Sequence, residues 1–217
     1  MPETKPAQNG LAQEGKIYRF KSSEGEEYEY DVRNKLVDAS YLTGVVPSMR
    51  PVPFPVAEGM KVVPVNAIAD LKQHANCKDF IILGAGKTGM DACNHLLRNG
   101  VDCKNIRWIV PNDSFIIDRD YAFGTASPVI AGGIYPLDRK VEPKNWKCAT
   151  LSREEYHALK TVNIVRKGRV TEVTKYSLIM KGGRETVNEN TLFVDCTSNG
   201  LTSRPAVTVF SHDKLVL

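Results

Sequence analysis

Residues 80–100, which read FIILGAGKTGMDACNHLLRNG, constrain the fold of this chain more than any other stretch. The segment begins with four apolar residues without polar alternation, which is typical of a strand buried on both faces of a parallel sheet. A glycine-rich turn follows, and apolar residues then recur at helical spacing, which predicts an amphipathic helix ending at the cap position Gly100. Its apolar face would consist of Met90, Cys93, Leu96 and Leu97. A second apolar strand at 106–110 completes a strand–turn–helix–strand unit.

The turn between this strand and helix has the pattern G-x-G-x-x-G. Gly84 would allow the tight turn, Gly86 would let the backbone approach a pyrophosphate without a Cβ, and Gly89 would let the helix pack closely on the strand. The free N–H groups and the positive dipole end of the helix would face the bound anion. The alternative is a glycine-rich structural turn without a ligand. We therefore expect the following residues to form a dinucleotide-binding turn: Gly84, Ala85, Gly86, Lys87, Thr88 and Gly89.

The letters GAGKT also invite comparison with the phosphate-binding loop of nucleoside triphosphatases, which requires G-x-x-x-x-G-K-[ST]. The first glycine of that motif would fall on Ile81, inside the predicted strand, so we exclude this class of site. Lys87 in the first turn of the helix opposes the helix dipole unless a phosphate is bound nearby. It is either a phosphate contact or a solvated surface lysine, and the sequence leaves both readings open.

Composition narrows the classes of function. The chain is 42% hydrophobic and 25% charged, with a formal net charge of +4 and no basic run with interleaved aromatic residues, so we expect no nucleic-acid partner. It contains neither a run of about 18 apolar residues nor an apolar signal-peptide core, so we expect no membrane contact. The five cysteines form no C-x-x-C pair, which predicts reduced thiols in a cytoplasmic protein without a metal site. None of the four histidines lies in a nucleophile pattern, so we assign no catalytic residue.

The remaining elements are short. Before the central unit we expect a polar tail at 1–14, a hairpin at 16–20 and 27–31, a strand at 35–40, a proline-rich connection at 46–56, a strand at 61–65 and a short helix or turn at 66–74. After it we expect irregular chain with one helical turn at 115–145, a helix opened by the capping box at 152–155, meander strands at 163–174, 177–181 and 185–187, and a last apolar strand at 192–196. The predicted fold class is α/β, a Rossmann-like parallel sheet with a small antiparallel β-meander.

This order of elements resembles the NAD(P)H-binding domain of two-dinucleotide flavoproteins. GAGKTGMDAC is similar to the G-x-G-x-S-G-x-D-x-A signature of flavin-containing monooxygenases and their Baeyer–Villiger relatives. Thr88 stands at the serine position, Asp91 at the aspartate, and Cys93 replaces the final alanine. Residues 30–51 and 190–205 resemble the strand-plus-turn segments through which such chains cross to and from their flavin domain.

The resemblance implies an NAD(P)H-binding domain that donates hydride to flavin in an oxidoreductase of monooxygenase-like lineage. Residues 61–200 would form this domain, between flavin-domain-like strands with a proline-rich crossover at 1–60 and a C-terminal tail at 201–217. No strand–GxGxxG–helix for FAD precedes residue 78, so these strands would belong to an incomplete flavin-type domain, and we expect FAD only where a complete one is supplied. The alternative is a non-catalytic dinucleotide-binding or interaction module whose exposed strands pair with another chain.

Two further residues are candidates for the adenosine end of the dinucleotide. Asp113 follows Gly89 at slightly more than the spacing of about 20 residues expected for a ribose-binding carboxylate. A carboxylate there favours NAD, because it would repel a 2′-phosphate, whereas the resemblance implies NADPH. Arg119 is either part of a surface charge cluster or a contact for that 2′-phosphate. The sequence therefore predicts NAD(P)H as the cofactor, with Asp113 and Arg119 added to the six turn residues.

Overall fold

The computed structural model describes residues 13–14, 17–40, 44–122, 132–198 and 205–217. The chain divides into two compact units, one formed by Met1–Gly44 with Gly200–Leu217 and the other by Val45–Asn199. The sequence placed the first boundary at residue 60, whereas the larger unit begins at Val45. The proline-rich connection at 46–56 therefore falls in the same unit as the glycine turn. Residues 1–12 of the predicted tail lie outside the described residues. In the described part of the chain, no helix is long and apolar enough to cross a membrane.

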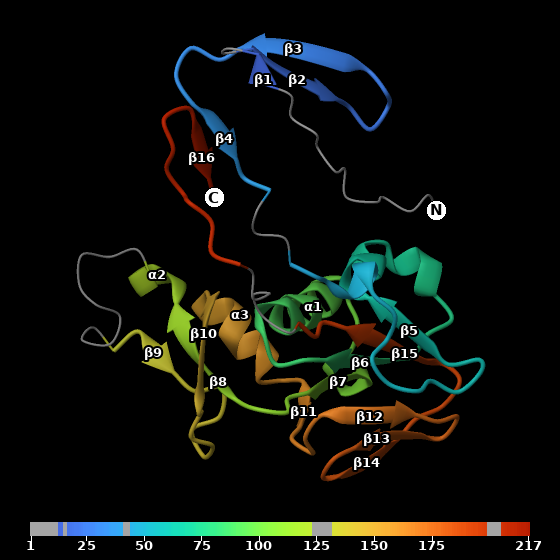
Figure 1. The fold of residues 1–217 in the computed structure, drawn as a ribbon. Coiled ribbons are helices and arrows are strands. Elements are labelled where there is room, and N and C mark those ends of the chain that lie inside the picture. Colours follow the sequence, from blue (N-terminus) through green and yellow to red (C-terminus); the bar gives the residue numbers. More distant parts are fainter. Residues whose placement is uncertain (1–12, 15–16, 41–43, 123–131, 199–204) are drawn as a thin grey trace. The chain divides into compact units, whose positions relative to one another are not determined.

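The larger unit is built around a five-stranded sheet with the strand order β11-β7-β6-β15-β5 (Figure 1). All neighbouring strands in this sheet are parallel. The strands are β5 (Lys61–Pro64), β6 (Asp79–Leu83), β7 (Ile106–Ile109), β11 (Asn163–Val165) and β15 (Thr191–Asp195). The central strands β6 and β15 are buried along nearly their whole length, as their unbroken apolar runs predicted. The predicted α/β fold with a Rossmann-like parallel sheet is confirmed.

One face of this sheet packs against helix α1 (Lys87–Arg98). Met90, Cys93 and Leu96 are buried and face a sheet surface that includes Ile82 and Trp108. The chain leaves the helix with Gly100 at φ +82°, in the left-handed conformation predicted for it. The short helix or turn expected before β6 is present as two 3₁₀ turns at Val65–Ala69 and Leu71–His74. Two others lie at Pro47–Met49 and Cys103–Asn105.

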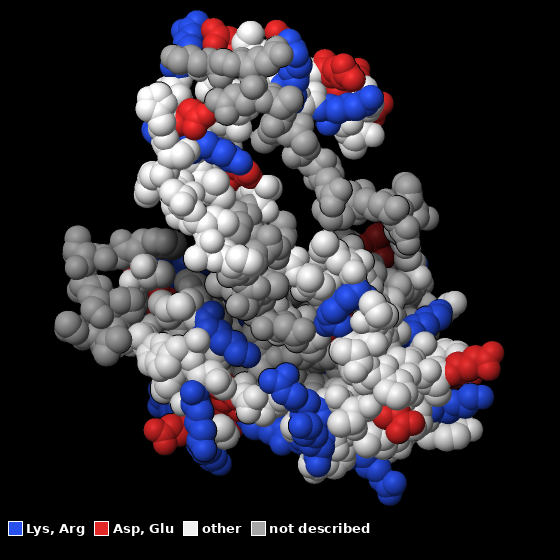
Figure 2. All heavy atoms as spheres, viewed as in Figure 1, with Lys and Arg blue, Asp and Glu red and all other residues white. Residues whose placement is uncertain are grey.

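The other face of the sheet is covered by an antiparallel meander of β12 (Val170–Val173), β13 (Ser177–Met180) and β14 (Gly183–Thr186). Leu178 and Met180 pack there against Ile81 and Phe193. The single strand predicted at 163–174 is in fact β11 and β12, because the chain turns out of the parallel sheet at Gly168 with φ +82°. Basic side chains gather over β11 and the meander on the face shown in Figure 2.

The segment between β7 and β11 holds more regular structure than the sequence predicted. β8 (Ser114–Asp118) pairs in parallel with β10 (Asn145–Leu151) and antiparallel with β9 (Ile134–Tyr135). The expectation of irregular chain at 115–145 is therefore wrong for β8 and β9, whereas the single helical turn expected there is present as α2 (Arg119–Ala122). Helix α3 (Arg153–Leu159) begins with the predicted capping box, in which both reciprocal bonds of Ser152 and Glu155 are present.

The smaller unit contains only strands among its described residues. β1 (Gln13–Glu14), β2 (Ile17–Lys21) and β3 (Glu27–Asp31) form an antiparallel sheet, which confirms the predicted hairpin. β4 (Leu36–Asp38) pairs in parallel with β16 (Lys214–Val216), a strand that the sequence did not predict. This pairing joins the two chain segments that make up the unit.

Candidate functional site

The glycine turn connects β6 to α1 at the carboxyl end of the parallel sheet. The next two strands of this sheet after β6 in the chain, β7 and β11, extend it to one side, whereas β15 and β5 lie on the other. The boundary between β6 and β15 is therefore a topological switch point. Open α/β sheets bind ligands in the crevice outside the carboxyl ends of their strands at such a point.

Gly84 makes the sharp turn out of β6 in a conformation that favours glycine. Its φ is +118°, and a Cβ on it would lie 3.0 Å from the carbonyl oxygen of Cys196. Its amide donates a hydrogen bond of 3.2 Å to the carbonyl oxygen of Ile109. The turn is thus fixed against the ends of the strands on both sides of β6.

Gly89 provides the close approach between α1 and the sheet. A Cβ on Gly89 would lie 2.2 Å from the carbonyl oxygen of Gly84 and 3.1 Å from Nε1 of Trp108. That indole nitrogen donates a 2.8 Å hydrogen bond to the same carbonyl of Gly84. A side chain at position 89 would therefore force the helix away from the turn.

Gly86 is different, because neither conformation nor packing requires a glycine there. It is the N-cap of α1, with φ −88° and ψ 178°, an extended conformation open to any residue. Apart from Gly86 and its two chain neighbours, no heavy atom of the described residues lies within 4 Å of the position that its Cβ would occupy. The helix also lacks a side-chain cap and an acidic residue in its first turn. The start of α1 is thus open space with positive helix-dipole potential.

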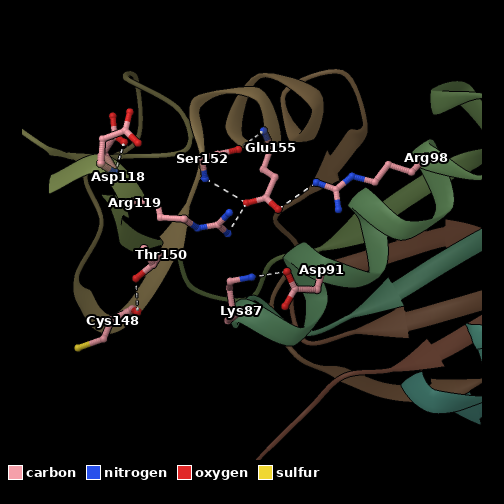
Figure 3. Close-up of polar contacts among 10 residues, drawn as sticks. Lys87, Asp91, Arg98, Asp118, Arg119, Cys148, Thr150, Ser152 and Glu155 are labelled. Carbon is pink, nitrogen blue, oxygen red and sulfur yellow. Dashed lines mark hydrogen bonds and ion pairs between the residues drawn. The ribbon is translucent and has the colours of Figure 1, made fainter. Parts of the chain in front are cut away.

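The other turn residues differ in exposure. Ala85 is buried at 7% exposure, whereas Thr88 is exposed on the first turn of α1. The ammonium group of Lys87 pairs with the Asp91 carboxylate one turn along the helix, as Figure 3 shows. Lys87 is therefore partly neutralised, and a phosphate at the turn would compete with Asp91 for it.

Asp113 does not point freely into the crevice. Its two carboxylate oxygens accept hydrogen bonds of 2.9 and 3.0 Å from the guanidinium of Arg166, which follows β11. Only 6% of the Asp113 side chain is exposed. The hydrogen bond to Asp113 raises the pKa of Arg166. The carboxylate that the sequence assigned to a ribose is thus engaged in an internal ion pair between the ends of β7 and β11.

Arg119 belongs to a cluster centred on Glu155 (Figure 3). Arg119 and Arg98 donate to the two carboxylate oxygens of Glu155 at 2.8 and 3.0 Å, and the amide of Ser152 donates at 3.0 Å. The cluster therefore joins α1, α2 and α3 through one nearly buried carboxylate. The Arg119 side chain remains 47% exposed, so it is still accessible to an anion.

The site also contains residues that sequence reasoning missed. At the carboxyl end of β15, the buried Asp195 lies 3.2 Å from the guanidinium of Arg50, and Arg50 also donates to the Thr197 hydroxyl at 2.7 Å. Their only sequence signal was their place in the two segments that resemble domain crossovers. Beside them, burial raises the pKa of the Cys196 thiol to about 12, so this thiol stays protonated. Among the described residues, no group of three or more His, Cys, Asp or Glu is placed to hold a metal ion.

The chain is similar to mycobacterial proteins. Uncharacterised proteins of Mycobacterium bovis and Mycobacterium tuberculosis are 36% identical to it over 228 residues. The match covers 92% of this chain and 42% of the relatives, so the chain spans less than half of their length. No protein-family model matches it.

Two solved structures resemble the fold more distantly. Bacillithiol disulfide reductase from Bacillus cereus aligns with a TM-score of 0.39 at 15% identity, over 85% of this chain and 47% of that one. Histamine dehydrogenase from Rhizobium aligns with a TM-score of 0.38 at 11% identity, over 74% of this chain and 22% of that one.

Proposed function

We propose that the unit Val45–Asn199 binds NAD(P)H at its glycine turn, with the pyrophosphate against Gly86 and the N-terminus of α1. The observation that carries this proposal is the open space beside Gly86, at the switch point between β6 and β15. Gly84 and Gly89 have structural reasons to be glycine, but Gly86 has none among the described residues. A ligand whose phosphates approach the backbone supplies the missing reason.

We further propose that NADPH binds more tightly than NADH. The charge of Asp113, which would repel a 2′-phosphate, is compensated by Arg166. Arg119 is half exposed and pairs with Glu155. Lys87, in the first turn of α1, is close enough to Glu155 for its charge to lower the pKa of the same carboxylate. Both cations are therefore available near the glycine turn. Titration with both dinucleotides tests this preference, and tighter binding of NADH would contradict it.

The bound dinucleotide would serve as hydride donor to a flavin, in an oxidoreductase of monooxygenase-like lineage, when a flavin domain is supplied. The cofactor supplies the hydride chemistry and this chain binds and orients it. The second candidate is a non-catalytic binding module, which is favoured by the exposed side chain of Val37 on the small sheet of β4 and β16. Flavin content separates the two: a yellow preparation that oxidises NAD(P)H supports the first, and a colourless one that binds the dinucleotide supports the second.

The substitution Gly86→Val tests the binding site directly. It places two methyl groups in the open space at the start of α1, while the extended backbone there tolerates valine. We expect NADPH affinity to fall by at least about tenfold, equivalent to roughly 1.4 kcal/mol, with little change in the thermal stability of the free protein. Fluorescence titration and thermal unfolding measure the two quantities.

Gly89→Val is the matched control for the same turn. Its Cβ would lie 2.2 Å from the carbonyl oxygen of Gly84, so it should lower thermal stability together with affinity. If Gly86→Val binds NADPH as tightly as the natural protein does, the glycine turn is structural and the proposed site is wrong.

A further inference from the structure

The polar cluster of Arg50, Asp195 and Thr197 is not used by the proposed function. Nη2 of Arg50 lies 3.2 Å from Oδ2 of Asp195 and donates to the Thr197 hydroxyl at 2.7 Å. The Thr197 amide and hydroxyl both donate to Oδ1 of Asp195, at 2.9 and 2.6 Å. Three donor groups from two segments of chain therefore converge on one carboxylate.

The carboxylate and the guanidinium of this cluster are both shielded from water. The Asp195 side chain is only 3% exposed and that of Arg50 only 18% exposed. A buried carboxylate that loses its cation is left with an uncompensated charge, so Asp195 favours a folded state in which Arg50 is in place. Asp195 thus holds Arg50 and Thr197 in a fixed arrangement at the end of β15.

The residues of this cluster lie near the two ends of the larger unit. The larger unit begins at Val45 and ends at Asn199. Arg50 lies just after the first of these points and Thr197 just before the second. The bond between Arg50 and Thr197 therefore joins the two places where the chain enters and leaves this unit.

The same cluster is continuous with the glycine turn. A Cβ on Gly84 would lie 3.0 Å from the carbonyl oxygen of Cys196 and 3.4 Å from the amide nitrogen of Thr197. The Cys196 amide in turn donates a 2.9 Å hydrogen bond to the carbonyl oxygen of Leu83, at the end of β6. Gly84 therefore packs directly against the backbone of residues 196–197.

We propose that Arg50 is a positioning residue: it holds both chain connections of the larger unit at the end of β15 and the backbone of 196–197 against Gly84. We call the hydrogen-bonded group of Arg50, Asp195 and Thr197 the clasp, and it depends only on the hydrogen bonds described above. Its effect on dinucleotide binding rests on the proposed function, because it acts through the same turn.

Hydrogen exchange of the ligand-free protein tests the clasp. In Arg50→Met we expect the amides of Cys196 and Thr197 to exchange at least about tenfold faster, and by a larger factor than those of the buried strand β6. Arg153→Met is the matched control, since Arg153 pairs at 3.0 Å with Asp118, whose side chain is 2% exposed, at the end of β8. This control should leave the exchange of Cys196 and Thr197 as in the natural protein.

A second variant and a second measurement keep the outcomes distinct. Thr197→Val preserves the ion pair and replaces only the hydroxyl by a methyl group. It should accelerate hydrogen exchange of the amide at position 197 even if Arg50→Met does not fold. NADPH affinity should fall in Arg50→Met and Thr197→Val but not in Arg153→Met. Unchanged exchange at 196–197 in both cluster variants, or equal acceleration in Arg153→Met, would overturn the clasp. If the natural protein binds neither NADPH nor NADH, the proposed function fails while the exchange data still decide the clasp.

Discussion

Opposing effects act on Glu155, the carboxylate at the centre of the cluster between α1, α2 and α3. Burial raises its pKa, but the hydrogen bond from the Ser152 amide, the bond from Arg98 and the positive charges of Arg119 and Lys87 together hold that pKa below its ordinary value of 4.5. Because the folded-state pKa is lowered, the ionised carboxylate stabilises the fold above the unfolded-state pKa. This contribution is lost as pH falls through the folded-state pKa.

The variant Glu155→Gln isolates this effect, since glutamine also serves at the third position of a capping box. We expect the natural protein to have the higher free energy of unfolding at pH 7 and the difference to shrink as pH falls below the ordinary carboxyl pKa of 4.5. Urea unfolding at a series of pH values measures the difference. Glu154→Gln, in the same first turn but exposed, is the control. A difference that stays constant down to pH 3 would contradict the assignment.

At this scale, the sequence predicted residues whose role follows from local spacing. Gly84 and Gly89 have the turn and packing environments expected of them, because a strand, a turn and a helix in succession fix where each glycine lies. Asp113 was assigned from spacing alone, and its partner Arg166 lies 53 residues away in the chain. Nothing in the local sequence identifies such a partner, since it is brought close only when β7 and β11 pair.

At the scale of elements, one buried aromatic side chain of β7 contacts both α1 and the glycine turn. Trp108 is fully buried, fills the space beside Gly89 and donates to the carbonyl of Gly84. Helix, strand and turn are thus connected by one indole. The sequence predicted α1 from its helical spacing and β7 from its apolar run, because both patterns are local. It missed β10 because that strand pairs in parallel with β8, and no turn signal connects the two.

Replacing this indole tests the connection. Trp108→Phe removes the donor to Gly84 and leaves space in the core, so we expect a loss of about 1–3 kcal/mol in the free energy of unfolding. The same substitution at Trp146, which is 58% exposed, is the matched control and should change stability by less than about 0.5 kcal/mol. Urea denaturation measures both, and a loss at Trp108 no larger than that at Trp146 would contradict the proposed connection.

At the scale of the whole molecule, the two compact units differ in how well they bury their apolar side chains. The larger one covers both faces of its parallel sheet, with α1 on one side and the meander on the other. The smaller one leaves large apolar side chains exposed, at Phe20, Val37, Val207, Val209 and Phe210. An isolated pair of strands is marginally stable in water, so the sheet of β4 and β16 would gain from a partner that covers it.

The parallel pair β4–β16 is the place where such a partner would add a strand. Among the described residues, β4 pairs only with β16, so its other edge offers unpaired backbone groups next to the 53% exposed side chain of Val37. Exposed apolar edge strands associate, and a lysine on the edge suppresses this association.

We therefore expect sedimentation velocity to show association that increases with protein concentration and is reduced by Val37→Lys. Tyr176→Lys is the control, because Tyr176 is 76% exposed in the turn between β12 and β13, away from an open edge. A protein that stays monomeric at every concentration, or one in which both lysine variants reduce association equally, would show that this edge is not a pairing site.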